Sequence, residues 1–545
     1  MKKLFENQKF LPGIIIFLYS VLNRFLTSLY SVRFSKEVME VDGACFYDVG
    51  RAILSGKVLY KDVFDHKTPY IYFINALGSL LEFNHIGLFI IEVLVLFFSL
   101  FYTYKFLILV IDRGHYSKKY NVNGENSIVS ISLVSTFLMG IAYSIRNVCF
   151  GYSRTEAFAV AFMMPALYLF MKHYLLIPKY QETNIRNRRM PMFIIGILAG
   201  LTFMTNIKAA VLFVPFAIVT AYIYIKQKKI KFIFELFFAG LLGIIVSLIP
   251  YIIYMLVTDS FNDMVYALID TNIAYSKSNI SVQVIGGEGS NNLEYNTNSG
   301  LIATIVSFTI LEPVVMVLIF IAIILLFINK YDVYVKTSVC LSAVTAFLYT
   351  MLSGRLHTYY LYIFLPYFLS ICIFVIKIIL LIKDKFKIQI KPLYILAFTF
   401  VLSLGLSYLL NARNLYVMNF NHSNRANKMK NIVAEYNENI KELKVFAFGF
   451  TPEIYNYLGA NIDYKYFILP SVSYKVNKKA FLEQYRYVNE ADPDIVVLNP
   501  AFSLSTFPND LKNMIATKLN ISYDFLGEVE MNKYAGSYYV FGKKR

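Results

Sequence analysis

Residues 232–257, FIFELFFAGLLGIIVSLIPYIIYMLV, form an apolar run whose one charged residue is Glu235. A helix needs about 20 apolar residues to cross the hydrocarbon core of a bilayer, so this run is long enough for one span. Ten similar runs lie near 10–31, 86–111, 126–146, 155–175, 191–205, 207–225, 300–328, 337–353, 359–382 and 391–411. The sequence therefore predicts a polytopic α-helical membrane protein with about 11 transmembrane helices. The runs 191–205 and 207–225 are either two spans or one helix broken near Asn206.

The composition agrees with a chain that lies mostly in lipid. Of its 545 residues, 57% are hydrophobic and 16% charged, and the mean hydropathy is +0.54. Such values exclude an ordinary soluble domain and a disordered chain. The net charge of +17 is expected in the cytoplasmic loops of a membrane protein, so we expect no nucleic-acid partner. The four cysteines stand singly and indicate neither a disulfide framework nor a zinc site.

The basic residues predict the orientation of the chain. With the N-terminus in the cytoplasm, the lysine- and arginine-rich loops all fall on the cytoplasmic side. The opposite side is poor in positive charge, and Lys277 is the one lysine or arginine in the loop 258–299. An odd number of spans places the residues after 411 outside. We therefore expect a multi-pass plasma-membrane protein with a cytoplasmic N-terminus and an extracytoplasmic C-terminal domain.

The predicted organisation has a transmembrane domain over 1–411, with external loops at 32–85 and 258–299, and an extracytoplasmic domain over 412–545. The last segment is polar and alternates short strands with helices. Strands are expected at 444–450 and 494–498, helices at 427–443 and 479–490, and a hairpin over 525–541 that turns near 533–536. This pattern is typical of a small α/β domain.

The first external loop has amphipathic helical character in both halves. Phe46, Val49, Ile53 and Leu54 make one apolar stripe, and Asp48 lies off it with Arg51. Such a helix would lie along the membrane surface. Gly56 is a plausible C-cap, and Pro69 can begin a helix over 70–81.

Packing does not explain the polar residues of this loop. They are Asp42, just beyond the first span, and Tyr60, Asp62, Asp65, His66 and Lys67. Ionisable groups at a membrane boundary are often functional, although a solvated, charge-balanced loop would contain the same residues. Carboxylates can also hold a divalent metal, but the spacing of Asp42, Asp62, Asp65 and His66 does not by itself indicate one.

The pattern Asp42-x3-Phe46-x3-Gly50-x5-Gly56-x3-Tyr60-x-Asp62-x2-Asp65-His66-Lys67-x-Pro69 resembles the first extracytoplasmic loop of the GT-C superfamily glycosyltransferases. The resemblance is to the bacterial family 39 branch, related to protein mannosyltransferases and aminoarabinose transferases. It implies a GT-C fold with a small C-terminal extracytoplasmic α/β domain. It also implies an enzyme that moves a sugar from a polyprenyl monophosphate to a hydroxyl at the outer face.

The same resemblance implies roles for two residues. Asp42 matches the general base, and Lys67 matches the lysine that contacts the donor phosphate. Many relatives have Asp-Glu where this chain has Asp42-Gly43, which puts any metal-binding role of the second carboxylate in doubt. A threonine between Lys67 and Pro69 also departs from the usual proline or glycine, but the charge is kept. The chemistry itself requires a carboxylate to accept a proton and a cation to neutralise the leaving phosphate.

Further polar residues stand at the predicted outer ends of spans, namely Arg154, Glu156, Lys208, Arg355 and His357. The stretch Arg355-Leu-His357-Thr-Tyr359-Tyr360 resembles a His-Tyr-Tyr stretch of the family, so Arg355 and His357, like His66, are candidate donor-phosphate contacts. Arg154 and Glu156 are either an internal pair or part of the site. Lys208 is either a snorkelling lysine or part of it. Tyr359 and Tyr360 are expected to anchor the interface.

The leading hypothesis is an inverting glycosyltransferase whose acceptor is a cell-surface polymer, lipid or protein. The alternatives are a transporter or flippase for lipid-linked sugars and a polysaccharide polymerase. A transporter predicts charges within the spans and inverted repeats. The charges within spans are few, Glu92, Glu235 and Glu312, and no repeat is evident.

Overall fold

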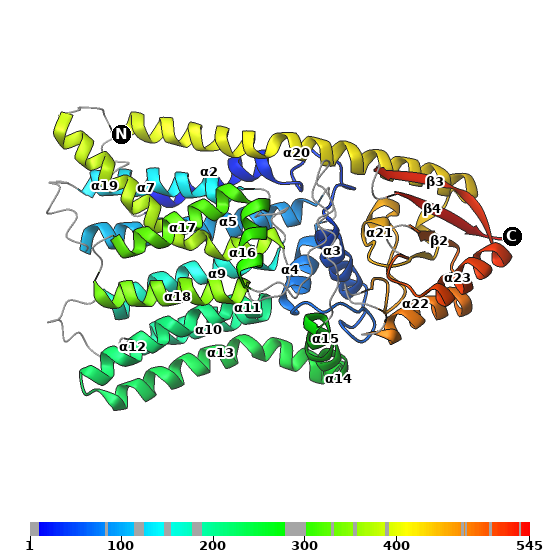
Figure 1. The fold of residues 1–545 in the computed structure, drawn as a ribbon, viewed down its shortest axis with the longest axis horizontal. Helices are drawn as coiled ribbons and strands as arrows, with labels where there is room; N and C mark the ends of the chain where they lie inside the picture. The colour runs from blue at the N-terminus through cyan, green and yellow to red at the C-terminus, as the bar shows by residue number, and fades with distance from the viewer. Residues whose placement is uncertain are drawn as a thin grey trace. The chain divides into compact units, whose positions relative to one another are not determined.

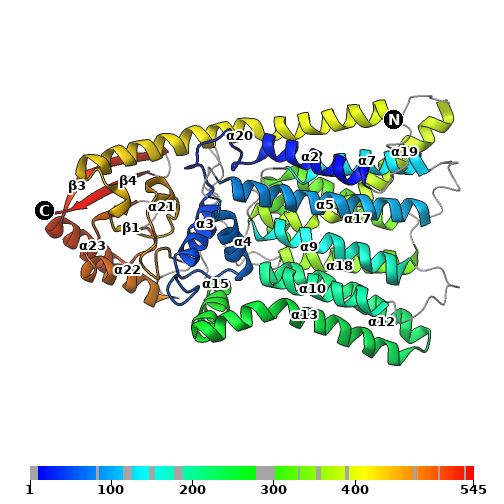
Figure 2. The same ribbon diagram turned by 180° about the vertical axis from the view of Figure 1, so that it is seen from behind.

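A computed structural model describes the chain except residues 1–9, 82–84, 114–124, 146–153, 177–187, 278–300, 329–331, 352–356, 387–391, 470–473, 475–476, 501–503 and 533–535. The chain divides into two compact units. Unit 1 comprises Met1–Ser28, Phe89–Pro250 and Ser299–Arg413, and unit 2 comprises Leu29–Leu88, Tyr251–Asn298 and Asn414–Arg545. Figures 1 and 2 show the ribbon from opposite sides.

Unit 1 is a bundle of apolar helices that lie side by side (Figures 1 and 2). They are α2 (Leu11–Thr27), α5 (Ile86–Arg113), α7 (Glu125–Ala142), α9 (Thr155–Phe170) with the π-turn η1 (Met171–Leu175), α10 (Arg189–Thr205), α11 (Ile207–Ala210), η3 (Val211–Phe213), α12 (Val214–Lys226), α13 (Ile230–Thr258), α16 (Leu301–Leu311), α17 (Pro313–Ile328), α18 (Val333–Met351), η5 (Thr358–Phe368), α19 (Leu369–Phe386) and α20 (Pro392–Tyr436). Helices α5, α13 and α20 continue into unit 2.

Each of the eleven predicted runs contains helix in the part that the structure describes. Among the described residues, seven helices are long and apolar enough to cross a membrane, and a bent helix pair brings this number to eight. The other three runs are the shorter apolar helices Leu11–Thr27, Ile128–Ala142 and Arg189–Thr205. The chain is therefore a multi-pass membrane protein.

Two breaks between helices refine this prediction. The run 300–328 is not straight, because Thr304–Leu311 and Pro313–Ile328 are bent by 118° where Pro313 cannot continue the helical hydrogen bonding. Near 206 the chain forms two separate helices. Asn206 is extended, and its side chain accepts a hydrogen bond from the Ala209 N–H that caps α11.

Unit 2 contains a four-stranded sheet in the order β1-β2-β4-β3. Strand β1 (Val445–Ala447) pairs in parallel with β2 (Ile495–Leu498), and β4 (Gly536–Lys543) is antiparallel to β2 and to β3 (Tyr523–Asn532). Three helices accompany the sheet, α21 (Glu453–Leu458), α22 (Lys478–Glu490) and α23 (Asn509–Ser522). These elements confirm the predicted α/β domain with its two buried strands, hairpin and helix near 479–490. The turn of the hairpin lies outside the described residues.

The helix predicted at 427–443 is the end of the 45-residue α20 and stops at Tyr436. Its polar part lies against the β3–β4 hairpin, where Ile432 and Tyr436 face the backbone of Gly527 and Gly542. The Tyr436 hydroxyl also donates to the carbonyl of Lys543 at 2.8 Å. This contact joins α20 to the sheet within unit 2.

The first external loop forms α3 (Val41–Leu54) and α4 (Tyr70–Ser79), with α14 (Phe261–Val265), η4 (Tyr266–Asp270) and α15 (Thr271–Lys277) in the same unit. Helix α3 ends at Leu54 with Ser55 as its C-cap, and the next residue, Gly56, has a left-handed φ of +91°. The N–H groups of Gly56 and Lys57 bond to the carbonyls of Ile53 and Ala52, which is the Schellman pattern. Pro69 begins α4, as predicted.

Other details of this loop differ from the prediction. Asp48 is buried at 2% exposure and Leu54 is 47% exposed, because α3 packs against both α4 and α21. The predicted apolar stripe is confirmed at Phe46 and Val49, which are buried, but not at Leu54. The stretch 59–69 is irregular rather than helical, since its backbone groups bond to side chains and to distant segments.

The packing of α3 on α4 depends on Gly50. A Cβ at this position would lie 2.6 Å from the backbone nitrogen of Ala76, so the two backbones touch. We expect Gly50→Ala to lower the free energy of unfolding by about 1–3 kcal/mol through overpacking. Thermal unfolding of the purified protein measures this change. Gly405→Ala, where nothing lies within 4 Å of the added Cβ, is the matched control, and equal melting temperatures for both variants would contradict the close contact.

Candidate functional site

The loop between α3 and α4 begins with a tight turn around Tyr60. Tyr60 adopts a left-handed φ of +65°, which is unfavourable for a residue with a Cβ. Its N–H donates to the Val63 carbonyl at 2.8 Å, and the Asp62 carboxylate accepts from the Val58 N–H at 2.8 Å. These bonds hold the turn, so the Asp62 carboxylate stabilises the conformation of the loop.

The Asp65 carboxylate is buried and is the centre of the loop's hydrogen bonds. It accepts hydrogen bonds from the Tyr72 hydroxyl at 2.6 Å, the backbone N–H of His66 at 2.7 Å and the Cys45 thiol at 3.5 Å. The His66 Nδ1 lies 3.1 Å from the same carboxylate. Burial alone would raise the pKa of Asp65, but the His66 contact, and then the Tyr72 hydroxyl and Lys67 charge, lower it to about 2. The group therefore stays ionised and links α3, the loop and α4.

The backbone of Lys67 and its neighbour is fixed on several sides. The Lys67 carbonyl accepts from the Tyr60 hydroxyl at 2.6 Å, and its N–H donates to the Tyr72 hydroxyl at 3.3 Å. The His66 carbonyl accepts from the Asn272 amide at 2.8 Å. The Lys67 side chain is half-buried. The Lys67 side chain therefore extends from a backbone that has little freedom to move.

Asp42 stands in the first turn of α3, two residues after the N-cap Glu40. Its side chain is half-buried. A carboxylate at this position is stabilised by the unpaired N–H groups of the helix N-terminus. Asp42 belongs to the same unit as Tyr60, Asp62, Asp65, His66 and Lys67.

The described residues contain no group of three or more His, Cys, Asp or Glu side chains placed to hold a metal ion. Of the carboxylates considered in the sequence, those of Asp62 and Asp65 accept hydrogen bonds from the protein. The described parts of the chain therefore offer no preformed metal centre made from this set.

In unit 1, three of the predicted polar residues lie with Tyr359 and Tyr360. The Arg154 guanidinium is 4.2 Å from the Tyr359 ring centre, and the Lys208 ammonium is 3.8 Å from that of Tyr360. His357 stacks on Tyr359 at 5.0 Å and meets Tyr360 edge-on at 5.3 Å. Arg355 lies outside the described residues. The two tyrosines are 9% and 7% exposed, so they position these cations and are not interface anchors.

Glu156 is held beside this cluster by Asn206. The Asn206 amide donates to Glu156 at 3.0 Å and to the Thr155 hydroxyl at 3.1 Å. The Thr155 hydroxyl donates to the second oxygen of Glu156 at 3.0 Å. Because Asn206 also caps α11, the break that places Lys208 is fixed to the start of α9. A cation over an aromatic face is attracted by the ring, so Tyr359 and Tyr360 hold Arg154 and Lys208 in one cluster that suits an anionic ligand.

Several residues of these networks carry no signal in the sequence. Tyr72 and Cys45 look like ordinary apolar positions of helices, and the bonds of Asn206 depend on tertiary contact. Two further histidines make contacts that the sequence does not indicate. His422 lies in α20 and bonds to the Tyr457 hydroxyl at 2.7 Å. His85 packs against the rings of Tyr30 and Tyr47.

No protein-family model matches this sequence, and no curated protein matches it. Two crystal structures of ArnT from Cupriavidus metallidurans are similar to the chain, one bound to undecaprenyl phosphate and one in the apo state. Each has a TM-score of 0.53 and 10% sequence identity over 97% of both chains. The chain has the ArnT fold. This likeness confirms the GT-C fold that the first external loop implies, and at 10% identity the ArnT structures establish the fold alone.

Helix α3, which carries Asp42, also buries the carboxyl group of Asp48. Within the described residues neither Asp48 oxygen has a hydrogen-bond partner, and the nearest cation is Arg51 at 3.6 Å. Burial raises the pKa of Asp48 from 3.8 to about 8 against the opposing effect of Arg51. The folded protein therefore keeps a proton that the unfolded chain loses.

This proton makes stability depend on pH. Between about pH 4 and pH 8 the folded state binds one more proton than the unfolded state, so stability falls as the pH rises through this range. Asp48→Asn should remove this contribution, and the melting temperature of the variant relative to the wild type should rise from pH 5 to pH 8. Asp510→Asn, an exposed control, should show no such trend. A pH-independent difference for Asp48→Asn would contradict a buried, protonated Asp48.

Proposed function

We propose that this protein is a membrane glycosyltransferase that moves a sugar from a polyprenyl-monophosphate donor to a hydroxyl of a cell-surface polymer, lipid or protein. The observation that carries the proposal is the likeness over 97% of both chains to ArnT, which was crystallised with undecaprenyl phosphate. The motif that contains Asp42 and Lys67 supports it independently of that likeness.

In the proposed reaction, Asp42 accepts the proton of the acceptor hydroxyl. The acceptor oxygen attacks the anomeric carbon while the bond from that carbon to the phosphate oxygen breaks. Polyprenyl phosphate leaves with the electron pair, and the configuration at the anomeric carbon inverts. One new glycosidic bond replaces the bond to phosphate, and the proton resides on Asp42.

Lys67 would neutralise the charge that develops on the leaving phosphate. A lysine suits this role because its ammonium is a compact point charge with three donors. Its carbonyl accepts a bond from Tyr60 and its N–H donates to Tyr72, which reduces the reorganisation needed when the donor lipid binds. His66, Arg355 and His357 are proposed as further donor-phosphate contacts, and Asp62, Asp65, Arg154, Glu156 and Lys208 as supporting residues.

We also propose that the reaction takes place at the outer face of the plasma membrane. The distribution of lysine and arginine supports a cytoplasmic N-terminus. The C-terminal α/β domain would then lie outside the cell, where a surface acceptor is available.

The test uses purified protein in nanodiscs with polyprenyl-phosphate sugars and a cell-envelope extract. Release of free polyprenyl phosphate is followed by mass spectrometry. We expect Asp42→Asn to lower the rate by about 10²–10⁴-fold and Lys67→Ala by about 10²–10³-fold. Asp524→Asn and Lys57→Ala, which make the same changes elsewhere in unit 2, should leave the rate unchanged.

Full activity of Asp42→Asn would exclude it as the base, and donor use unchanged in Lys67→Ala would exclude the phosphate contact. If folded wild-type protein released no polyprenyl phosphate from any donor, the glycosyltransferase proposal would fail. A lipid-scrambling assay on the same nanodiscs would then test the transporter alternative.

A further inference from the structure

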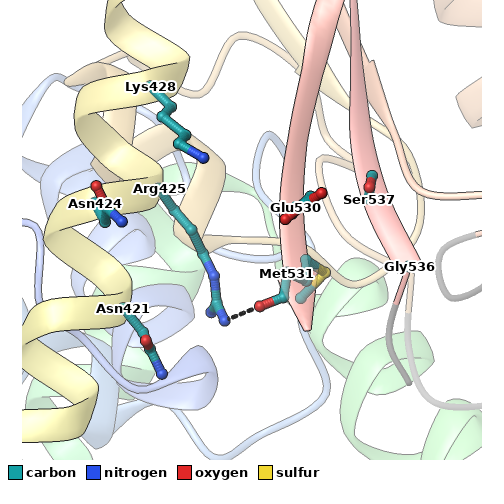
Figure 3. Close-up of a pocket in the computed structure, with 8 residues that line it drawn as sticks. All are labelled: Asn421, Asn424, Arg425, Lys428, Glu530, Met531, Gly536 and Ser537. Carbon is teal, nitrogen blue, oxygen red and sulfur yellow. Dashed lines mark hydrogen bonds between the residues drawn. The ribbon is translucent and has the colours of Figure 1, made fainter. Parts of the chain in front are cut away.

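Unit 2 contains a polar pocket between the end of α20 and the β3–β4 hairpin (Figure 3). Its volume is about 460 Å³, within the usual range for small-ligand sites. It is lined by Asn421, Asn424, Arg425, Lys428, Glu530, Met531, Gly536 and Ser537. None of these residues is among the candidate catalytic or donor-binding residues.

One wall of the pocket is a single face of α20. Residues 421, 424, 425 and 428 recur at the i, i+3, i+4 and i+7 spacing of one helical face. Figure 3 shows Arg425 and Lys428 extending from the helix toward β3. This wall offers two amides and two positive charges.

The opposite wall is shaped by a bulge in β3. Glu530 pairs with Ser537 and Asn532 with Gly536, so Met531 is an extra residue in its strand. The Met531 carbonyl accepts a hydrogen bond from Arg425. The bulge thus ties the hairpin to α20, and the pairing of Glu530 with Ser537 places a carboxylate and a hydroxyl side by side.

Buried side chains behind α20 and the hairpin fix this geometry. His422, on the neighbouring turn of α20, bonds to Tyr457 at 2.7 Å. Tyr538, next to Ser537, donates to the buried Glu453 at 2.5 Å. Both walls are therefore anchored to the α/β domain by helix α21.

Five of the lining side chains make no hydrogen bond or ion pair with any other described residue. They are Asn421, Asn424, Lys428, Glu530 and Ser537. Amides and a carboxylate, which together donate and accept, match the hydroxyls of a sugar or polyol. Arg425 and Lys428 outnumber the single acid Glu530, so the pocket carries a net positive charge. Such a set matches a hydroxyl-rich ligand with one anionic group.

We propose that this pocket binds a sugar or polyol unit that carries a phosphate or carboxylate group. Arg425 and Lys428 bind the anionic group, and the amides of Asn421 and Asn424, with Glu530 and Ser537, bind hydroxyls. This next step rests on the proposed function. The bound unit is part of the acceptor, so the acceptor is an anionic glycan or polyol polymer.

The test measures binding to the full-length protein in nanodiscs, without donor lipid, by saturation-transfer NMR. The probes are glucose 6-phosphate, glucuronate, neutral glucose and inorganic phosphate. At least one of the two anionic sugars should bind more tightly than both glucose and inorganic phosphate. Lys428→Ala and Asn424→Ala should each weaken that binding about tenfold, as expected for loss of a bond to a charged or hydroxyl group.

Lys478→Ala on α22, an exposed lysine of the same unit, is the matched control and should bind like the wild type. Arg425→Ala is avoided as the main variant because Arg425 also holds the hairpin. The pocket assignment would be overturned if glucose or inorganic phosphate bound as tightly as the anionic sugars. It would also be overturned if Lys428→Ala and Asn424→Ala bound the anionic sugar like the wild type.

The acceptor role is tested separately from transfer chemistry. In the donor-release assay, Lys428→Ala should raise the KM for the envelope acceptor and leave kcat near the wild-type value. An unchanged KM would overturn the acceptor role and leave the proposed function intact. If the protein bound the anionic sugar but released no polyprenyl phosphate, the proposed function would be overturned and the pocket assignment would stand.

Discussion

The ionised carboxylate of Asp65 determines the conformation of the first external loop. A buried charge is costly unless hydrogen bonds compensate it, and here the Tyr72 hydroxyl and the His66 N–H provide them. Because these partners come from α4 and from the loop itself, the charge can be buried only when both are in place. The carboxylate, with a pKa of about 2, keeps this role across the whole physiological pH range. The backbone position of Lys67 depends on the same tyrosine.

This arrangement separates the acidic residues of one short motif into two kinds. The carboxylates of Asp62 and Asp65 accept hydrogen bonds that fix the loop, whereas Asp42 stands at a helix N-terminus. The proposed chemistry needs one base and one phosphate-binding cation on a stable frame. We propose Asp42 and Lys67 for these two roles. The aromatic cluster of Arg154, Lys208 and His357 is held in a comparable way by Tyr359 and Tyr360.

The fold was largely predictable because apolar length and strand periodicity are local signals. Every predicted run contains helix in its described residues, and the strands near 445 and 495 and the hairpin occur where expected. What the sequence did not show depends on tertiary contact. Asp48 is buried because α21, about 400 residues later in the chain, covers α3, and the stretch 59–69 is irregular because distant side chains bond its backbone. The motif supplies the proposed site residues, whereas the contacts of Tyr72, Asn206 and Tyr360 are defined only by the folded structure.

The proposed chemistry depends on Lys67 binding the phosphate of a polyprenyl-phosphate donor. The most direct measurement is a cryo-electron-microscopy structure of the wild-type protein in nanodiscs loaded with undecaprenyl phosphate. We expect lipid phosphate density with an oxygen within about 4 Å of the Lys67 ammonium, the distance of an ion pair. Phosphate density bound elsewhere, with the Lys67 ammonium beyond that distance, would contradict it.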